Sequence, residues 1–293
     1  MHNKTNQTMF TDSTLLQAVK SIHYAEAILI TAGAGMGVDS GLPDFRGNKG
    51  FWRAYPPFAR MGLSFTQLAN PEWFNRDPGL AWGFYGHRLN LYRRTQPHAG
   101  FYQLLEIVKQ KKGNYFVFTS NVDGHFLKAG FDPAKLVECH GSIHHLQCAR
   151  PCQKTIWSAD NLNITVREKD FRATGNMPTC INCGQMARPN ILMFGDWSWL
   201  AGRTQEQEYR FSNWIDSILE NNLRLVIIEI GAGQAVATVR MTSEQIAGMC
   251  NAMLVRINPR DDQVPTGHIS LHCRAAEGIE RIYHILRQPT LGL

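Results

Sequence analysis

Short apolar runs alternate along the chain with segments in which apolar residues recur at helical spacing. Residues 14–25 have the helical pattern and predict an amphipathic helix. The next apolar run, residues 27–30, is short enough for a fully buried strand and leads into the glycine-rich residues 33–37. A buried strand followed by a glycine loop is the place where a doubly wound α/β sheet binds a nucleotide.

The later apolar runs continue this rhythm. Helical patterns such as residues 100–111 separate several of them, and an alternation of strands with helices predicts a mostly parallel sheet. The further strand candidates are residues 115–119, 136–138, 225–230 and 253–258. The hydrophobic pattern therefore predicts an α/β fold built on a Rossmann-like, doubly wound parallel sheet.

Two stretches depart from the rhythm and are predicted to be insertions. Residues 48–90 are rich in aromatic side chains and predict a helical insertion. Residues 146–186 are polar, contain only short patterns and carry four cysteines, so they predict a second, smaller module. The Rossmann-like domain then comprises residues 14–47, 91–145 and 187–293.

The composition of the chain indicates which classes of ligand and partner to expect. Of the 293 residues 44% are hydrophobic, which is enough for a sizeable core. The formal net charge of +6 favours an acidic ligand such as a phosphate-bearing cofactor, but the basic residues are scattered, so we expect no specific nucleic-acid partner. No apolar run approaches the ~20 residues of a membrane helix. The polar first ten residues lack the apolar stretch of a secretory signal, so we expect a cytoplasmic protein without membrane contact.

Four of the seven cysteines form two close pairs. Cys148 and Cys152 make the first pair, and after 27 intervening residues Cys180 and Cys183 make the second. Two such pairs can supply four thiolates to a tetrahedral zinc ion at ~2.3 Å. The alternative is four unrelated buried thiols, which paired spacing disfavours. A closed set of four ligands leaves no open coordination position, so we predict one structural zinc ion.

The glycine loop belongs to a longer motif. Residues 31–47 read Thr-Ala-Gly-Ala-Gly-Met-Gly-Val-Asp-Ser-Gly-Leu-Pro-Asp-Phe-Arg-Gly. Val38 stands where the ordinary dinucleotide fingerprint has its third glycine, so the glycines alone are a weak signal. The complete run resembles the first NAD-binding motif of the sirtuins, the Sir2 family of NAD-dependent protein deacylases.

Further segments resemble the same family in chain order. Residues 119–123 (Thr-Ser-Asn-Val-Asp) look like its Thr-Gln-Asn-Ile-Asp segment, and residues 138–142 look like the strand end that bears its catalytic histidine. The cysteine pairs lie where the family has its zinc module, and residues 188–196 look like its substrate-binding stretch. Residues 231–233 and 257–258 lie where it has late nucleotide contacts.

The resemblance implies NAD as cofactor, acylated lysine in proteins as substrate, and nicotinamide and an O-acyl-ADP-ribose as products. It implies that His140 is the general base for a ribose hydroxyl, a task that suits an imidazole titrating near ~6.5. A single histidine after a strand is otherwise more often a hydrogen-bonded structural residue. The NAD contacts implied by the motifs are Gly33, Ala34, Gly35, Asp44, Phe45, Arg46, Ser120, Asn121, Asp123, Gly231 and Asn258.

Tyr85 and Arg88 are candidates for substrate specificity. They lie three residues apart, so on a helix they share one face. The pair looks like the Tyr-x-x-Arg motif of the class III sirtuins, which remove succinyl, malonyl and glutaryl groups from lysine. Arg88 would pair with the acyl carboxylate and Tyr85 would donate a hydrogen bond. The alternative is a core tyrosine beside a solvated arginine.

Two departures from the family pattern keep other functions open. Ser120 replaces the usual glutamine, and Gly37 replaces the usual serine. The alternatives are a protein mono-ADP-ribosyltransferase or NAD hydrolase on the same fold, and a weakly active NAD-sensing module. The presence of His140 and of the Tyr85 and Arg88 pair favours the deacylase over the transferase.

Overall fold

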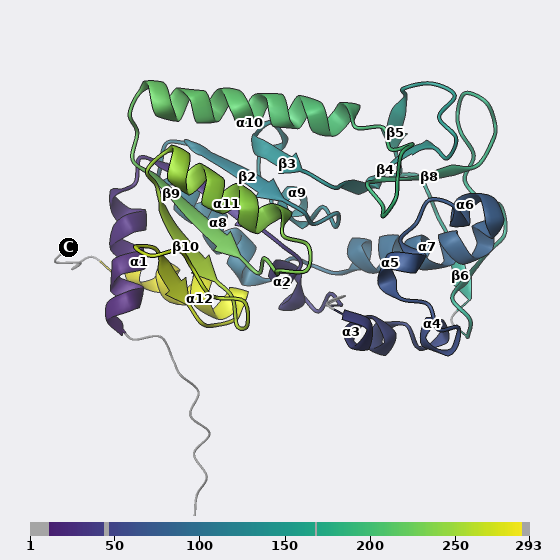
Figure 1. The fold of residues 1–293 in the computed structure, drawn as a ribbon, viewed down its shortest axis with the longest axis horizontal. Helices are drawn as coiled ribbons and strands as arrows, with labels where there is room; N and C mark the ends of the chain where they lie inside the picture. The colour runs from purple at the N-terminus through teal and green to yellow at the C-terminus, as the bar shows by residue number, and fades with distance from the viewer. Residues whose placement is uncertain (1–11, 44–46, 168, 289–293) are drawn as a thin grey trace, which may run out of the picture. The chain divides into compact units, whose positions relative to one another are not determined.

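The computed structural model describes residues 12–43, 47–167 and 169–288 (Figure 1). Within these residues, no helix combines the length and the apolar character needed to cross a membrane.

The described chain divides into two compact units. Unit 1 comprises residues 12–39, 98–118 and 212–288, and unit 2 comprises residues 40–97 and 119–211, with the gaps named above. Both predicted insertions fall within unit 2, together with the segment that carries His140.

The main sheet has six strands in the order β11-β10-β9-β1-β2-β3. Strand β9 pairs in parallel with β1 and with β10, and β10 pairs in parallel with β11. The strands are β1 (Ala27–Ala32), β2 (Tyr115–Thr119), β3 (Leu136–Glu138), β9 (Leu225–Ile230), β10 (Met253–Ile257) and β11 (Ile269–Leu271). The predicted doubly wound α/β sheet is therefore confirmed, and β11 is a strand that the hydrophobic pattern did not indicate.

Burial explains why these strands read as unbroken apolar runs. Every residue of β1, β2 and β9 is buried, as expected for strands covered on both faces. Helix α11 packs against β9 and β10, while α8 and α12 pack against each other and α1 packs against α12 (Figure 1). These helices are α1 (Asp12–Tyr24), α8 (Ala99–Lys109), α11 (Thr238–Met249) and α12 (Ala275–Leu286); α10 (Gly202–Glu220) extends through both units.

The strand order places a topological switch point between β1 and β9. From β1 the chain continues to β2 and β3 on one side, whereas β9, β10 and β11 extend the sheet on the other side. In open α/β sheets, ligands bind outside the carboxyl ends of the strands at such a point. Here the loops that follow β1 and β9 begin with Gly33 and Gly231.

Unit 2 contains two small antiparallel sheets and a group of short helices. The larger sheet has the order β5-β4-β8, and β6 pairs with β7 in a hairpin. Its strands are β4 (Gly141–Cys148), β5 (Ile156–Ser158), β6 (Thr165–Arg167), β7 (Arg172–Thr174) and β8 (Ala187–Ile191). Its helices are α3 (Gly47–Ala54), α4 (Pro56–Arg60), α5 (Phe65–Leu68), α6 (Trp73–Arg76), α7 (Pro78–Arg94), α9 (His125–Lys128) and the 3₁₀ turn η1 (Pro133–Lys135); α2 (Gly35–Val38) belongs to unit 1.

The aromatic-rich segment is helical and supplies the core of unit 2. Its rings pack in edge-to-face, stacked and tilted pairs, with centroid separations such as 6.0 Å between the edge-to-face rings of Phe51 and Phe84. Helix α7 lies close to the hairpin because Gly83 and Gly86 face it: a Cβ at these positions would clash with Phe171 and Ile164. The hairpin between the cysteine pairs is thus packed directly onto α7.

Candidate functional site

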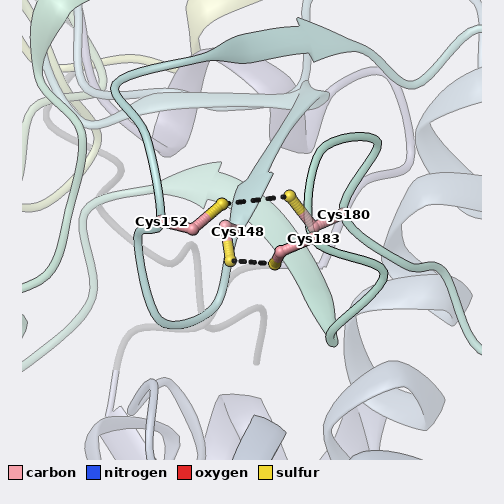
Figure 2. Close-up of side chains that lie close together, drawn as sticks. All are labelled: Cys148, Cys152, Cys180 and Cys183. Carbon is pink, nitrogen blue, oxygen red and sulfur yellow. Dashed lines mark hydrogen bonds between the residues drawn. The ribbon is translucent and has the colours of Figure 1, made fainter.

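The four paired cysteines converge on one point of unit 2 (Figure 2). Their sulfur atoms all lie within 4.8 Å of one another, with 3.8 Å between Cys148 and Cys183 and 3.7 Å between Cys152 and Cys180. Four sulfurs at ~2.3 Å from a tetrahedral zinc are ~3.8 Å apart, so the cluster fits one zinc ion. Four thiolates would fill every position of a tetrahedral ion, so the zinc ion that this cluster fits is a structural one.

Three side chains of helix α7 donate hydrogen bonds to backbone carbonyls in and directly after the module that carries the cysteines. Trp82 Nε1 donates to the carbonyl of Ala187 at 3.1 Å, and Asn90 Nδ2 donates to the carbonyl of Ile164 at 2.8 Å. Arg93 donates to the carbonyl of Leu162. The cysteine-bearing module is therefore hydrogen bonded to the helix that contains Tyr85 and Arg88.

His140 follows β3 and is held by backbone hydrogen bonds on both sides. The N–H of Cys139 donates to the carbonyl of Thr119 at 2.9 Å, and the N–H of Leu192 donates to the carbonyl of His140 at 3.0 Å. The imidazole itself is hydrogen bonded to the backbone of Ser120. The structure thus brings His140 and the predicted segment 119–123 together.

Burial lowers the pKa of His140 below its ordinary value of 6.5, and the hydrogen bond to Ser120 only partly opposes this effect. The imidazole is consequently neutral at pH 7. A neutral imidazole can accept a proton, which is the state that a general base requires.

A polar network anchors the strand that leads to His140. Glu138 is buried and forms an ion pair with Arg203 at the start of α10. Its N–H donates to Gln207 Oε1 at 3.0 Å, and its carbonyl accepts from Thr204 Oγ1 at 3.2 Å. Sequence reasoning did not assign these partners, because they lie more than sixty residues away along the chain.

Asn121 and Asp123 lie in a compact turn after β2. The N–H of Asn121 donates to Thr119 Oγ1 at 3.1 Å. Asp123 is buried, and its Oδ1 accepts the N–H of His125 at 2.8 Å. The carbonyl of Asp123 accepts from His144 Nε2 at 2.9 Å. One carboxylate oxygen of Asp123, Oδ1, therefore has a structural role in this turn.

The glycine loops of unit 1 touch backbone to backbone. The N–H of Gly33 donates to the carbonyl of Ile230, and that of Gly35 donates to the carbonyl of Gly231, both at 3.0 Å. A Cβ on Gly33 would lie 2.8 Å from the Cα of Ala232, and a Cβ on Gly231, whose φ is +61°, would lie 2.5 Å from Gly35. In this loop Gly33 is buried, Gly35 is half-buried and Ala34 is exposed to solvent.

Asn258 is wholly buried and joins two loops of unit 1. Its Nδ2 donates to the carbonyl of Ala232 at 2.8 Å, and its Oδ1 accepts the N–H groups of Arg260 and Asp261, both at 3.1 Å. Its amide therefore positions the loop after β9. The other three predicted NAD contacts, Asp44, Phe45 and Arg46, lie outside the residues that the structure describes.

The stretch predicted to resemble a substrate-binding segment turns around a buried ion pair. Arg188 and Asp196, both wholly buried, approach to 2.8 Å. Asp196 also accepts the N–H of Met193. On either side of Asp196 the chain exposes Phe194 and Trp197, the latter almost completely.

Tyr85 and Arg88 are both buried on α7. Tyr85 is only 1% exposed, as the core alternative expected, but Arg88 is 6% exposed and is not a solvated side chain. The hydroxyl of Tyr85 has no hydrogen-bond partner among the residues that the structure describes. Arg88 donates to the hydroxyl of Tyr92, a residue that the sequence analysis missed although it lies one helical turn further on.

Comparison with known sequences gives one family. The Sir2 family profile matches residues 33–219. An NAD-dependent protein deacylase of Thermus thermophilus is 28% identical over 269 residues, covering 90% of this chain and 92% of the relative. An NAD-dependent protein deacetylase of Saccharolobus solfataricus is 36% identical over 166 residues, covering 56% of this chain and 58% of the relative.

Solved structures of this kind share the fold. A crystal structure of a Sir2 homologue with NAD superposes with a TM-score of 0.68 at 22% identity, covering 93% of each chain. A mutant Sir2 homologue in complex with ADP-ribose superposes with a TM-score of 0.66 at 23% identity, covering 92% of this chain and 96% of the other.

Proposed function

The chain belongs to the Sir2 family, and from that membership we propose that it is an NAD-dependent deacylase of lysine side chains in proteins. The observation that carries the proposal is the placement of His140: a half-buried, neutral imidazole is oriented by the backbone of Ser120 beside the motif segment 119–123. General bases of this kind contribute ~10²–10⁴-fold to rate.

The residues present fit NAD. The switch point between β1 and β9 carries two glycine loops in backbone contact, which is the feature of the sheet where a dinucleotide binds. Bound NAD supplies an electrophilic ribose carbon and nicotinamide as its leaving group. We assign the loop of Gly33, Ala34 and Gly35 to the pyrophosphate, with Gly231 as its close-packed neighbour.

We assign the polar residues that follow β2 and β3 to the chemistry of the reacting end. The amide of Asn121 and the carboxylate of Asp123 suit a nicotinamide amide and ribose hydroxyls. With NAD bound, His140 would accept the proton of a ribose hydroxyl, which would activate that oxygen as a nucleophile. Ser120 orients His140 through its backbone, and Asn258 acts by positioning the loop after β9.

The proposal extends to the class of acyl group. A buried hydroxyl without a partner costs ~1–3 kcal/mol, and among the described residues the hydroxyl of Tyr85 has none. The ring of Tyr85 lies 5.6 Å from Cζ of the buried Arg88 guanidinium. Burial raises the pKa of Tyr85 to about 12, so that the hydroxyl remains a donor. A hydroxyl and a guanidinium suit the carboxylate of a succinyl or malonyl group, and we infer a preference for these groups over acetyl.

The test is turnover of one peptide sequence that carries acetyl-, succinyl- or malonyl-lysine. We expect faster removal of the acidic groups by the wild type and a roughly tenfold or larger loss of that preference in Arg88→Met. Arg94→Met, an exposed position on the same helix, is the matched control and keeps the preference.

Each contrary result overturns a definite part of the proposal. An unchanged acetyl-to-succinyl ratio in Arg88→Met removes the role of that residue. Nicotinamide release without deacylated peptide replaces the deacylase by ADP-ribosyl transfer or NAD hydrolysis. NAD binding without any turnover leaves an NAD-sensing module.

A further inference from the structure

Arg88 and Tyr92 form a charged hydrogen-bonded pair one turn apart on α7. Arg88 Nε lies 3.0 Å and Arg88 Nη2 lies 2.9 Å from the hydroxyl oxygen of Tyr92, so one edge of the guanidinium is directed at a single acceptor. Both residues are buried, at 6% and 5% exposure. Burial and the shared helix together restrict the orientations that the two side chains can adopt.

Among the residues that the structure describes, three aromatic rings lie close to the same guanidinium. Its Cζ lies 5.2 Å from the ring centroid of Phe84, 5.6 Å from that of Tyr85 and 5.4 Å from that of Tyr92. Contacts with ring faces hold a cation in place but do not select which of its N–H edges points in a given direction. The hydroxyl of Tyr92 does select an edge, because hydrogen bonds depend on direction.

We propose that Tyr92 is a positioning residue for acidic acyl groups: by accepting from Nε and Nη2 of Arg88, it fixes the orientation in which the guanidinium meets an acyl carboxylate. This inference rests on the proposed preference for succinyl- and malonyl-lysine. Tyr92 thereby joins Tyr85 and Arg88 as a third residue for acyl specificity. Its task differs from theirs, because it orients Arg88 and does not itself contact the acyl group.

The chemistry of the pair predicts which kinetic constant changes. Phenylalanine at position 92 keeps the ring but removes the acceptor, which leaves two buried N–H groups of Arg88 to turn toward other partners. The recognition of a carboxylate then weakens, whereas a neutral acetyl group makes no use of the guanidinium. The change is therefore expected in KM for acidic acyl groups and only weakly in kcat.

The experiment compares Tyr92→Phe with the wild type on succinyl-lysine and acetyl-lysine versions of one peptide. We expect KM for the succinyl peptide to rise about tenfold and KM for the acetyl peptide to change less than about twofold. Tyr102→Phe, at an exposed position of α8, is the matched control and is expected to keep both values. Melting temperatures of all three proteins verify that they are folded.

The outcomes separate this inference from the proposed function. A wild type without preference for the succinyl peptide overturns the acyl preference and the role of Tyr92 together. A wild type with the preference, which Tyr92→Phe retains in full, overturns the role of Tyr92 alone. An equal rise of KM for both peptides, or a loss confined to kcat, assigns Tyr92 a merely structural role and also overturns the inference.

Discussion

The imidazole of His140 is hydrogen bonded to the backbone of Ser120, the residue that stands where the sirtuin pattern has glutamine. Because the contact uses the backbone of residue 120, it does not depend on which side chain stands there. The departure at position 120 therefore bears on contacts of the side chain with a ligand and leaves the base itself in place.

The first prediction concerns pH. Burial lowers the pKa of His140, so the base form persists below pH 6.5, and protonation removes activity only at lower pH. The acid limb of kcat/KM is thus expected to have its midpoint below 6.5. The measurement uses an acetyl-lysine peptide without titrating side chains between pH 5 and 8. A midpoint at or above 6.5 contradicts the assignment of His140 as a buried neutral base.

The second prediction concerns the contact between the glycine loops. Gly33→Ala places a Cβ 2.8 Å from the backbone of Ala232, and we expect a loss of ~1–3 kcal/mol in unfolding free energy and weaker NAD binding. Denaturant unfolding and calorimetric titration with NAD measure these two effects. The control is Gly248→Ala on α11, where a Cβ has open space and stability is expected to stay equal or to rise. Wild-type stability and affinity in Gly33→Ala would disprove the close contact.

The third prediction concerns the metal. Cys180→Ser removes one of four thiols, and zinc content is expected to fall from about one ion per chain to a small fraction of that value, with a lower melting temperature. Elemental analysis by mass spectrometry measures the number of zinc ions per chain. Cys250→Ser changes a cysteine outside the cluster and is expected to retain the metal. Zinc that remains stoichiometric in Cys180→Ser, or is absent from the wild type, refutes the four-thiolate site.

Much of the fold follows from local patterns. Strands buried on both faces are unbroken apolar runs, so residues 27–30 and 225–230 were recognisable without any neighbour. Strand β11 was not, because its sequence Ile-Ser-Leu alternates buried and half-buried positions and forms no continuous apolar run. The cysteine pairs needed only their spacing, since a metal imposes its ligand set on the sequence.

The site contains features that no local pattern reveals. The ion pair of Glu138 with Arg203 joins residues that are distant in sequence, so it depends on the tertiary fold. The burial of Arg88 likewise depends on rings that the fold collects around it. Tyr92 is different, because its spacing from Arg88 already placed both on one helix face.

The most direct measurement of the central claim follows one acyl-lysine peptide by mass spectrometry, with and without NAD, for the wild type and His140→Ala. The account predicts that the wild type removes the acyl group only with NAD, that nicotinamide appears in equal amount, and that His140→Ala is slower by about 10²-fold or more. Deacylation without NAD, or a His140→Ala protein as fast as the wild type, would contradict it.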